Sequence, residues 1–420
     1  MKKNNIPLEN FLKTAGKANY KYIRAIVKNQ AQTQTELAKL FAVSRANISG
    51  RIGDLIKKKL ITDTSTVSSV RPYKTVKKKK LGLRPGFFYI VAVIINQEPG
   101  ITIGIIDSSF KIIYQKTTAN FFTNLEDSEI QKLYAGISEI LHKKKICFYE
   151  IIALAFAVKG VINQQTGLLY NRSTSFFSQA SWSPHAAINT NQMHNMNFAC
   201  DLDKKFGKFF KSMPPLSFIN ALSVECCALI LSEEHKKTGS FLYIGNGLAL
   251  RLVSSQNIIG GLDHAAGEIG MCKTGSGYLL RDVFPLWVIS QEIRIRMKNG
   301  EQTLAEYENY RCNIPEEILR KGWNMKDPLT VSVITKAFEE FSAIIRNIVI
   351  ACMPQKIILK NRPFNDVLIW FLEKNLNDIY FSSQQEKISV VSGNTDNNEL
   401  LHALAVYAFE REMKSLIETH

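Results

Sequence analysis

The sequence predicts an α/β protein in which a small, basic helical domain precedes a body of two α/β lobes. Three observations support this prediction. The first 84 residues hold 20 Lys and Arg against 4 Asp and Glu, so they carry the whole net charge of +16. Apolar residues within this basic segment recur at helical spacing. From Phe87 onward, strand-like runs alternate with helical stretches, as expected of α/β lobes.

The composition excludes several classes of protein. A chain of 420 residues that is 45% hydrophobic is long enough for two or three domains with apolar cores. No apolar run approaches the roughly 18 residues of a membrane span, and the N-terminus lacks the apolar segment of a signal peptide. The seven cysteines are irregularly spaced and form no CxxC pairs, so neither a disulfide framework nor a cysteine-rich zinc site is expected. We therefore expect a cytoplasmic protein with reduced thiols and no membrane contact.

Residues 18–62 are predicted to form three short helices. The first contains apolar residues at helical spacing in "YKYIRAIV". The second begins after Thr33, and Glu36 three residues later completes a capping box. Its expected apolar face consists of Leu37, Leu40 and Phe41.

The third helix, in "SRANISGRIGDLIKKKLI", is predicted to bind DNA. Its expected buried stripe is Ile48, Ile52, Leu55 and Ile56. The opposite face carries side chains that hydrogen-bond to base edges and phosphates, namely Ser44, Arg45, Asn47, Ser49 and Arg51. Two helices joined by a short turn match a helix-turn-helix, whose second helix enters the major groove of double-stranded DNA. The alternative is an ordinary three-helix bundle with a solvated basic face.

The segment after these helices is rich in Thr, Ser and Val and then becomes strongly basic. It predicts a hairpin wing, so that residues 1–75 form a winged helix-turn-helix domain, followed by a basic linker at 76–86. Arg71 and Lys74 are candidate DNA contacts in the wing, and Arg is favoured electrostatically in the minor groove. Lys77 to Lys80 are candidates for phosphate contacts. For this lysine run, a flexible, merely solvated linker is an open alternative.

The rest of the chain is predicted to form two lobes, residues 87–200 and 201–420. Strands are expected in "FFYIVAVIINQEPGITIGIIDSSFKIIYQKTT", "EIIALAFAVKGVINQQTGLLYN", "SFLYIGNGLALRLVSSQNIIGG", "PQKIILKN" and "KISVVSG". Helices are expected at 127–143, 220–236, 286–299, 330–351 and 397–418, and the last of these is a candidate to return to the first lobe. Two such lobes facing a cleft suit a small-molecule site.

The order of motifs in the body resembles the ROK family of repressors, open-reading-frame proteins and kinases. "AFAVKGVINQQTGLL" is similar to the family's pG-V-D-x-x-x-G segment, and "FINALSVECCALILSE" to its NDANAAALAE segment. "LYIGNGLALRLVSSQNIIGGLDHAAGEIGM" is similar to its glycine loop followed by AGEIGH. The resemblance spans nearly the whole chain. It implies an actin-like, hexokinase-type (ribonuclease H-like) body behind an N-terminal winged helix-turn-helix.

The resemblance also implies that this chain lacks residues that the family's kinases need for catalysis. The family's kinases take the sugar proton with the Asp of the NDAN motif, and this chain has Ala221 there. Their nucleotide loops are replaced by "YIVAVIINQEPGITIG" and "IILKNRP". We therefore expect no enzymatic activity, no catalytic residue and no cofactor.

The effector site implied by the resemblance is reduced. Gly160, Asn220 and Glu268 are the candidate residues for a sugar or sugar-phosphate effector. Glu268 has a second interpretation, in which it caps a helix N-terminus. The family's zinc loop is shortened to "CKTGSGYLL", Met271 stands where the family has His, and only Cys272 is nearby. No metal site is expected, and His264 is interpreted as a surface residue.

Together these features predict a DNA-binding transcriptional regulator of carbohydrate-related genes, with a repressor favoured over an activator. We expect it to act as a homodimer or higher homo-oligomer on a double-stranded DNA operator. Two alternatives stay open. One is a ROK-type sugar kinase fused to a DNA-binding domain, and the other is a DNA-binding scaffold that responds to no ligand.

Overall fold

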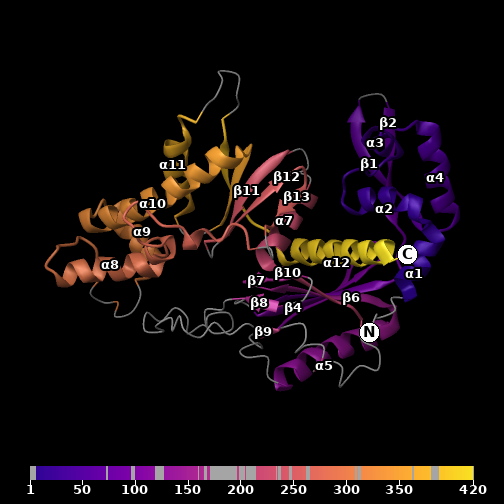
Figure 1. Cartoon of the computed structure of the whole chain (residues 1–420), viewed down its shortest axis with the longest axis horizontal. Coiled ribbons are helices and arrows are strands. Elements are labelled where there is room, and N and C mark those ends of the chain that lie inside the picture. The colour runs from indigo at the N-terminus through magenta and orange to yellow at the C-terminus, as the bar shows by residue number, and fades with distance from the viewer. Residues whose placement is uncertain are drawn as a thin grey trace. The chain divides into compact units, whose positions relative to one another are not determined.

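A computed structural model of the chain divides into two compact units (Figure 1). The first unit comprises Met1–Lys236 and Thr395–His420, and the second comprises Lys237–Asn394. The structure describes residues 6–71, 74–95, 100–118, 127–158, 160–164, 168–170, 196–197, 204, 214–232, 234, 238–245, 248–261, 265–307, 310, 314–361, 364–379 and 387–419. Within those ranges no helix is both long and apolar enough to cross a membrane.

The N-terminal domain in the first unit is a winged helix-turn-helix. It contains α1 (Ile6–Ala15), α2 (Tyr20–Val27), α3 (Gln34–Leu40) and α4 (Arg45–Lys57), followed by the antiparallel strands β1 (Ile61–Arg71) and β2 (Lys74–Leu83). The predicted caps are confirmed. The Thr33 hydroxyl accepts from the Glu36 amide at 3.2 Å, and the Ser44 hydroxyl accepts from the Asn47 amide at 3.2 Å. These caps fix where α3 and α4 begin and thereby set the turn between them.

Three sequence predictions for this domain were wrong. Leu40 and Ile56, predicted to be buried, are 48% and 37% exposed. Both lie near a helix end, where the underlying bundle no longer covers the predicted stripe. The lysine run at 77–80, predicted to belong to a linker, lies within β2 and is paired with β1. A linker is also excluded at its far end, because the Ser108 hydroxyl donates to the Arg84 carbonyl at 2.7 Å and accepts from the Phe87 amide at 3.1 Å.

The lobe of the first unit is built on a five-stranded sheet with the order β10-β6-β3-β4-β5. Its strands are β3 (Tyr89–Ile95), β4 (Ile101–Asp107), β5 (Ile112–Thr118), β6 (Ile151–Val158) and β10 (Leu216–Asn220). Strands β3, β4 and β5 are antiparallel, while β6 and β10 run parallel to β3. Helix α5 (Asp127–Lys144) covers one face, through a cluster that includes Leu133, Ile137 and Ile140.

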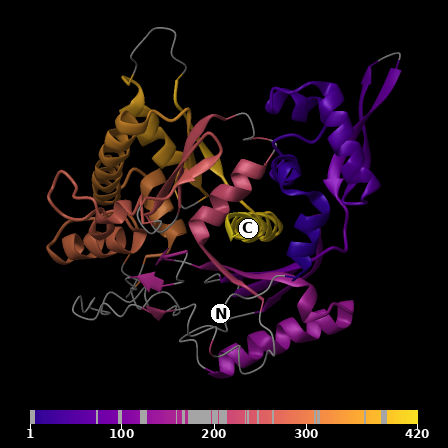
Figure 2. The same ribbon diagram turned by 45° about the vertical axis from the view of Figure 1, so that its right-hand side comes forward.

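The other face of this sheet is covered by α12 (Asn397–Thr419) and α7 (Ala221–Leu231). Figure 2 looks nearly along α12, which lies against the sheet and beside α7. The packing is close, because a Cβ atom on Gly104 of β4 would lie 2.8 Å from the Leu401 side chain. The C-terminal helix is therefore a central element of the first unit, although it follows the whole second unit in sequence.

The N-terminal domain shares its core with this lobe. Phe11 of α1 packs edge-to-face on Phe87, Phe88 and Phe409, with ring centroids 5.7, 5.6 and 6.2 Å apart. One apolar cluster extends from α1, α2 and α4 to the sheet and α12. Aromatic contacts of this kind contribute beyond their buried area, so the DNA-binding domain is packed onto the lobe rather than tethered to it.

The second unit contains a five-stranded sheet with the order β13-β12-β11-β14-β15. The strands are β11 (Ser240–Ile244), β12 (Leu250–Ser254), β13 (Asn257–Ile259), β14 (Lys356–Lys360) and β15 (Ser389–Gly393). The helices are α8 (Leu286–Lys298), α9 (Glu316–Asn324), α10 (Pro328–Cys352) and α11 (Asn365–Leu376). Three antiparallel strands followed by two parallel ones repeat the topology of the first sheet, as expected for a duplicated α/β fold.

The division between the units differs from the predicted boundary at residue 200. Strand β10 pairs with β6, and α7 packs on the same sheet, so residues 216–231 belong to the first unit. Sequence order does not reveal this, because β6 and β10 are separated by more than fifty residues.

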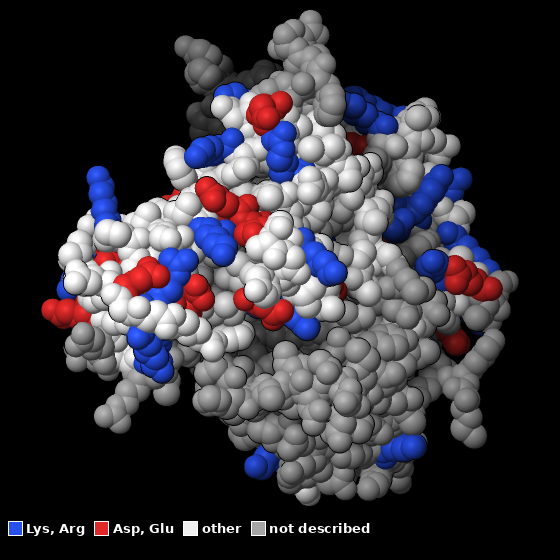
Figure 3. All heavy atoms as spheres, turned by 60° about the vertical axis from the view of Figure 1, so that its left-hand side comes forward, with Lys and Arg blue, Asp and Glu red and all other residues white. Residues whose placement is uncertain are grey.

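Acidic and basic side chains lie close together over much of the described surface in Figure 3. Two such pairs in the second unit join Arg320 to Asp366 at 2.7 Å and Arg346 to Asp378.

Candidate DNA-binding surface and ligand site

Helix α4 presents the predicted DNA-reading residues on its outer face. Ser44, Arg45, Asn47 and Ser49 are exposed, whereas Ile48, Ile52 and Leu55 are fully buried against the domain core. This division follows from the helical spacing of Ile48, Ile52 and Leu55, and the Ser44 cap fixes where the helix begins. The exposed set supplies one guanidinium, one amide and two hydroxyls, which are groups that hydrogen-bond to bases and phosphates.

Arg51 differs from the other four candidates. It is half-buried, its Nε donates to the Asn47 Oδ1 at 3.0 Å, and its Nη1 donates to the Asn19 Oδ1 at 3.3 Å. Its guanidinium carbon lies 6.0 Å from the centre of the Tyr22 ring. Arg51 thus orients Asn47 and connects α4 to α2, so the two residues form one hydrogen-bonded group rather than two independent contacts.

Two glycines on α4 were not identified from the sequence. A Cβ atom at Gly50 or Gly53 would meet no atom within 4 Å, so packing does not require either glycine. With Ala46 and Ser49 they follow i, i+3, i+4 and i+7 spacing, which leaves one side of the helix without bulky side chains. A helix with such a face can approach a DNA groove closely. Two glycines within one helix were the available sequence signal, since glycine there lowers helix stability.

The wing places Arg71 and Lys74 at its tip. They are the last paired residues of the antiparallel hairpin, and the register continues through Lys77, paired with Val67, and Lys80, paired with Thr64. The base of the wing is fixed to the helices, since the Leu81 amide donates to the Gln32 carbonyl at 2.7 Å. The basic run Lys77–Lys80 therefore belongs to a paired strand that continues from the helices.

Two of the candidate ligand residues meet at the end of the first sheet. Asn220 ends β10 and caps α7, and its Oδ1 accepts from the Ser223 amide at 3.2 Å. Its Nδ2 donates to the Gly160 carbonyl at 2.6 Å. Gly160 has φ of +102°, a conformation that favours glycine. Asn220 is buried and holds the Gly160 turn in place, so part of its hydrogen-bonding capacity is committed within the protein.

The third candidate, Glu268, lies in the second unit beside a buried arginine. Its Oε1 is 3.8 Å from the Arg251 Nη1, and its side chain is 37% exposed. Burial raises the pKa of the Glu268 carboxyl, and the Arg251 charge opposes that effect. Glu268 precedes the short helical turn Ile269–Met271 without a side-chain capping hydrogen bond, so the structure does not support the capping interpretation.

Arg251 was not identified from the sequence, although it is the largest fully buried side chain among the described residues. Its Nη1 donates to the carbonyls of Leu250 and Ala266 at 2.8 and 2.6 Å, which fixes the glycine loop to β12. At Gly267, φ is +91° and a Cβ atom would lie 2.1 Å from the Leu250 carbonyl oxygen. Only glycine fits there, so the loop glycines serve close backbone packing as well as any ligand.

The shortened loop "CKTGSGYLL" is held by a carboxylate from α10. Glu340 accepts from the amides of Gly275 and Ser276 at 2.7 and 3.1 Å, and the Thr274 hydroxyl donates to the Tyr278 carbonyl at 2.9 Å. Charge-assisted hydrogen bonds to two adjacent amides are strong and directional. Glu340 was not identified from the sequence, because 65 residues separate it from Gly275 in the loop. The predicted surface residue His264 lies outside the described residues.

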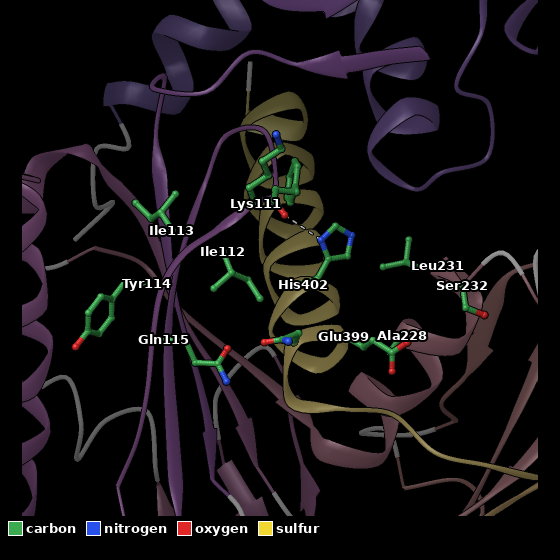
Figure 4. Close-up of a pocket in the computed structure, with 12 residues that line it drawn as sticks. Lys111, Ile112, Ile113, Tyr114, Gln115, Ala228, Leu231, Ser232, Glu399 and His402 are labelled. Atoms are coloured by element: carbon green, nitrogen blue, oxygen red, sulfur yellow. Dashed lines mark hydrogen bonds between the residues drawn. The ribbon is translucent and has the colours of Figure 1, made fainter. Parts of the chain in front are cut away.

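A pocket of about 800 Å³ lies in the first unit, away from the predicted ligand residues (Figure 4). It lies beside β5 and between α7 and the start of α12, with Ile112, Leu231 and His402 among its walls. The His402 Nδ1 is 3.0 Å from the Phe110 carbonyl, which can only accept, so Nδ1 carries the proton. Burial lowers the pKa of His402 below its ordinary value. Gly160 and Asn220 do not line this pocket.

No protein-family model and no curated protein matches the sequence. Solved structures do match. A ROK family transcriptional regulator, a homologue of the E. coli MLC protein, is 16% identical with a TM-score of 0.64, covering 98% of this chain and 99% of that one. The fold is that of ROK proteins. The match includes the winged helix-turn-helix of this chain, because it extends over nearly the full length of both chains.

Two further solved structures match a smaller share of this chain. A ROK hexokinase from Thermus thermophilus is 12% identical with a TM-score of 0.55, covering 77% of this chain and 99% of that one. A ROK family protein from Streptococcus pneumoniae, solved in complex with sucrose, is 14% identical with a TM-score of 0.53, covering 78% of this chain and 100% of that one.

Proposed function

We propose that the protein is a DNA-binding transcriptional regulator, acting as a repressor of carbohydrate-related genes. The observation that carries the proposal is the exposed outer face of α4, with Arg45 and Asn47, on a strongly basic domain that is packed onto a ROK body. A basic excess confined to this domain favours a polyanionic partner. Ser44, Ser49 and Arg51 complete the proposed contact set on α4, and Arg71 and Lys74 contribute from the wing.

Gel-shift titration with DNA from upstream of the protein's own gene tests this function. Specific binding should persist at a salt concentration that removes binding to a scrambled duplex. Arg45→Ala should weaken specific binding by about 1–3 kcal/mol while changing nonspecific binding much less. Lys298→Ala, an exposed charge removal on α8, is the matched control. Binding that is purely nonspecific and lost at moderate salt would contradict the proposal.

The proposed effector is a sugar or sugar phosphate contacted by Glu268, whose half-exposed carboxylate can accept hydroxyl hydrogen bonds. Gly160 and Asn220 provide a fixed turn at the end of β10. A thermal-shift panel of sugars and sugar phosphates tests the effector. A ligand at 100 times its Kd should add about 2.7 kcal/mol of stability, and Glu268→Gln should abolish the shift. If no compound in the panel stabilises the protein, a scaffold that responds to no ligand is favoured.

We further propose that the body performs no phosphoryl transfer. Ala221 begins α7 at the position where the resemblance places a catalytic Asp, and a methyl group cannot accept a proton. No ATP consumption above background is expected with glucose or N-acetylglucosamine. Turnover that disappears in Glu268→Gln would instead support the alternative of a sugar kinase with a fused DNA-binding domain.

The protein is proposed to act as a homodimer or higher oligomer on a two-part operator. Two helices equivalent to α4 would then bind half-sites separated by about one DNA turn, roughly 34 Å. Light scattering on the full chain and footprinting on the bound duplex test this arrangement. A monomer that protects a single half-site would contradict it.

A further inference from the structure

Helix α12 makes polar contacts with five separate parts of the first unit. Near its start, the Asn397 amide contacts the Thr102 hydroxyl of β4 at 3.4 Å, and His402 contacts the Phe110 carbonyl. Further along, Tyr407 contacts Gln164, Glu410 contacts α2, and Glu412 accepts from the Ser217 hydroxyl of β10 at 3.5 Å. A helix that was needed only to cover the sheet would require its apolar side alone, so these contacts call for a separate explanation.

The contact with Gln164 connects α12 to the candidate ligand turn. The Tyr407 hydroxyl donates to the Gln164 Oε1, four residues after Gly160, whose carbonyl is held by Asn220. Burial raises the pKa of Tyr407 to about 12, so the phenol stays protonated and remains a donor. A shift of the Gly160–Gln164 segment therefore changes a hydrogen bond that α12 makes.

The contact with α2 connects the same helix to the DNA-binding domain. Glu410 lies three residues after Tyr407, and its carboxylate is 2.7 Å from the Arg24 Nε and 3.5 Å from the Lys28 Nζ. Residues at i and i+3 are neighbours along one side of a helix. The end of α2 makes a second contact, since the Asn29 Nδ2 donates to the Leu231 carbonyl at the end of α7 at 3.3 Å.

The ion pair is better suited to orientation than to stability. The Arg24 side chain is 49% exposed and that of Glu410 is 22% exposed, and ion pairs this accessible contribute little to the free energy of folding. A carboxylate shared by Arg24 of α2 and Lys28, the residue that follows α2, nevertheless fixes the rotation of that helix about its axis relative to α12. Helix α2 packs against the helices that present the DNA-binding face.

We infer that Tyr407 and Glu410 are positioning residues through which the Gly160–Gln164 turn sets the orientation of the DNA-binding domain. This inference rests on the proposed function. A ligand that moves the Gly160–Gln164 turn alters the hydrogen bond between Gln164 and Tyr407. Because Glu410 lies one helical turn further along α12, a shift of this helix also alters the ion pair between Glu410 and Arg24 of α2. DNA binding must by linkage alter the turn in return, which allows a test without knowing the ligand.

The test uses hydrogen exchange on the full chain, with and without a duplex selected by the wild-type protein from a randomised pool. In the wild type, DNA should slow exchange at residues 160–164 although they lie outside the DNA-binding domain. Tyr407→Phe should still bind the duplex while losing this change. Gln164→Ala removes the acceptor instead of the donor and should give the same result, which keeps the test valid if one variant folds poorly. Glu418→Gln on the same helix, whose partner Lys414 is on α12 itself, is the matched control.

A double-mutant cycle of Arg24→Ala and Glu410→Ala in DNA affinity tests the second contact. Glu410→Ala should weaken specific binding about fivefold or more, the scale of measured couplings between sites. The double variant should bind the duplex no more weakly than the weaker-binding single variant, because both changes break the same contact. Failure of the wild type to select any duplex would overturn the proposed function itself. Selection without a change at 160–164, or additive effects in the cycle, would overturn only this inference.

Discussion

The two five-stranded sheets share one topology, yet the loops beside them are held in different ways. In the second unit, the glycine loop is fixed to its own strand by the buried Arg251, and the "CKTGSGYLL" loop is held by Glu340. In the first unit, the Gly160–Gln164 turn is held by Asn220 and by Tyr407 of α12, a helix that also packs on the DNA-binding domain. Loop contacts in the second unit stay local, while those in the first extend toward the DNA-binding surface.

This difference in loop contacts indicates how the two halves of a duplicated fold can have separate roles. A change in a self-contained loop is limited to the strands and helices that hold it. A change in the first unit is shared with the DNA-binding domain, because that domain and the lobe have a common apolar core. The following predictions test contacts within each unit, beginning with the largest expected effect.

Phe409→Ala should have the largest effect. Phe409 is fully buried and contacts Phe11, Phe88 and Phe110 across the junction of the DNA-binding domain and the lobe. Loss of a core phenylalanine costs about 3–5 kcal/mol. Hydrogen exchange should speed up in both α1 and the first sheet, since they share this cluster. Faster exchange in α1 alone, or in the sheet alone, would show that the two do not unfold together.

Arg251→Met should destabilise the second unit by about 2–3 kcal/mol. The change leaves the carbonyls of Leu250 and Ala266 without their buried donor, and unsatisfied buried polar groups carry this cost. Peptide-resolved hydrogen exchange should report the loss in residues 248–271 and leave α1 to α4 unchanged. Lys273→Met, a charge removal at an exposed site in the same unit, is the control. An equal effect on the DNA-binding domain would contradict the local character of the loop.

Glu340→Gln should lower the free energy of local opening of the "CKTGSGYLL" loop by about 1–2 kcal/mol. The neutral amide still accepts from Gly275 and Ser276 but loses the charge assistance. Exchange should increase at residues 274–278 with little change in global unfolding. Glu339→Gln, at the neighbouring position on α10, serves as control. If both variants behave alike, the carboxylate does not hold the loop.

The smallest effect concerns pH and His402. Burial depresses the pKa of His402 in the folded state, so the unfolded chain binds a proton more readily. Its contribution to stability is therefore complete above the unfolded pKa of about 6.5 and is lost as pH falls through that value. Urea unfolding of the wild type between pH 7.5 and about 5 should show a steeper decline than that of His402→Gln. Equal slopes for the two proteins would exclude His402 as the cause.

The sequence by itself determined the local features of the protein. The capping residues Thr33 and Ser44, the buried positions Ile48, Ile52 and Leu55 on α4, and the order of the predicted strands and helices follow from short-range patterns, and the structure confirms them. The ROK resemblance rested on a few short motifs and predicted the body fold correctly. Helices α1, α9 and α11 were not predicted.

The tertiary structure alone decided how these parts are connected. That β10 pairs with β6, and that Glu340 and Arg251 hold loops distant in sequence, depends on contacts between residues far apart in the chain. The return of α12 to the first lobe was expected only as a candidate, and the contacts of that helix with the first sheet establish it. The exposure of Leu40 and Ile56 has the same origin, because periodicity identifies an apolar stripe but not how far the neighbouring helices cover it. Short-range patterns specify elements, whereas burial and long-range hydrogen bonds specify which elements share a core.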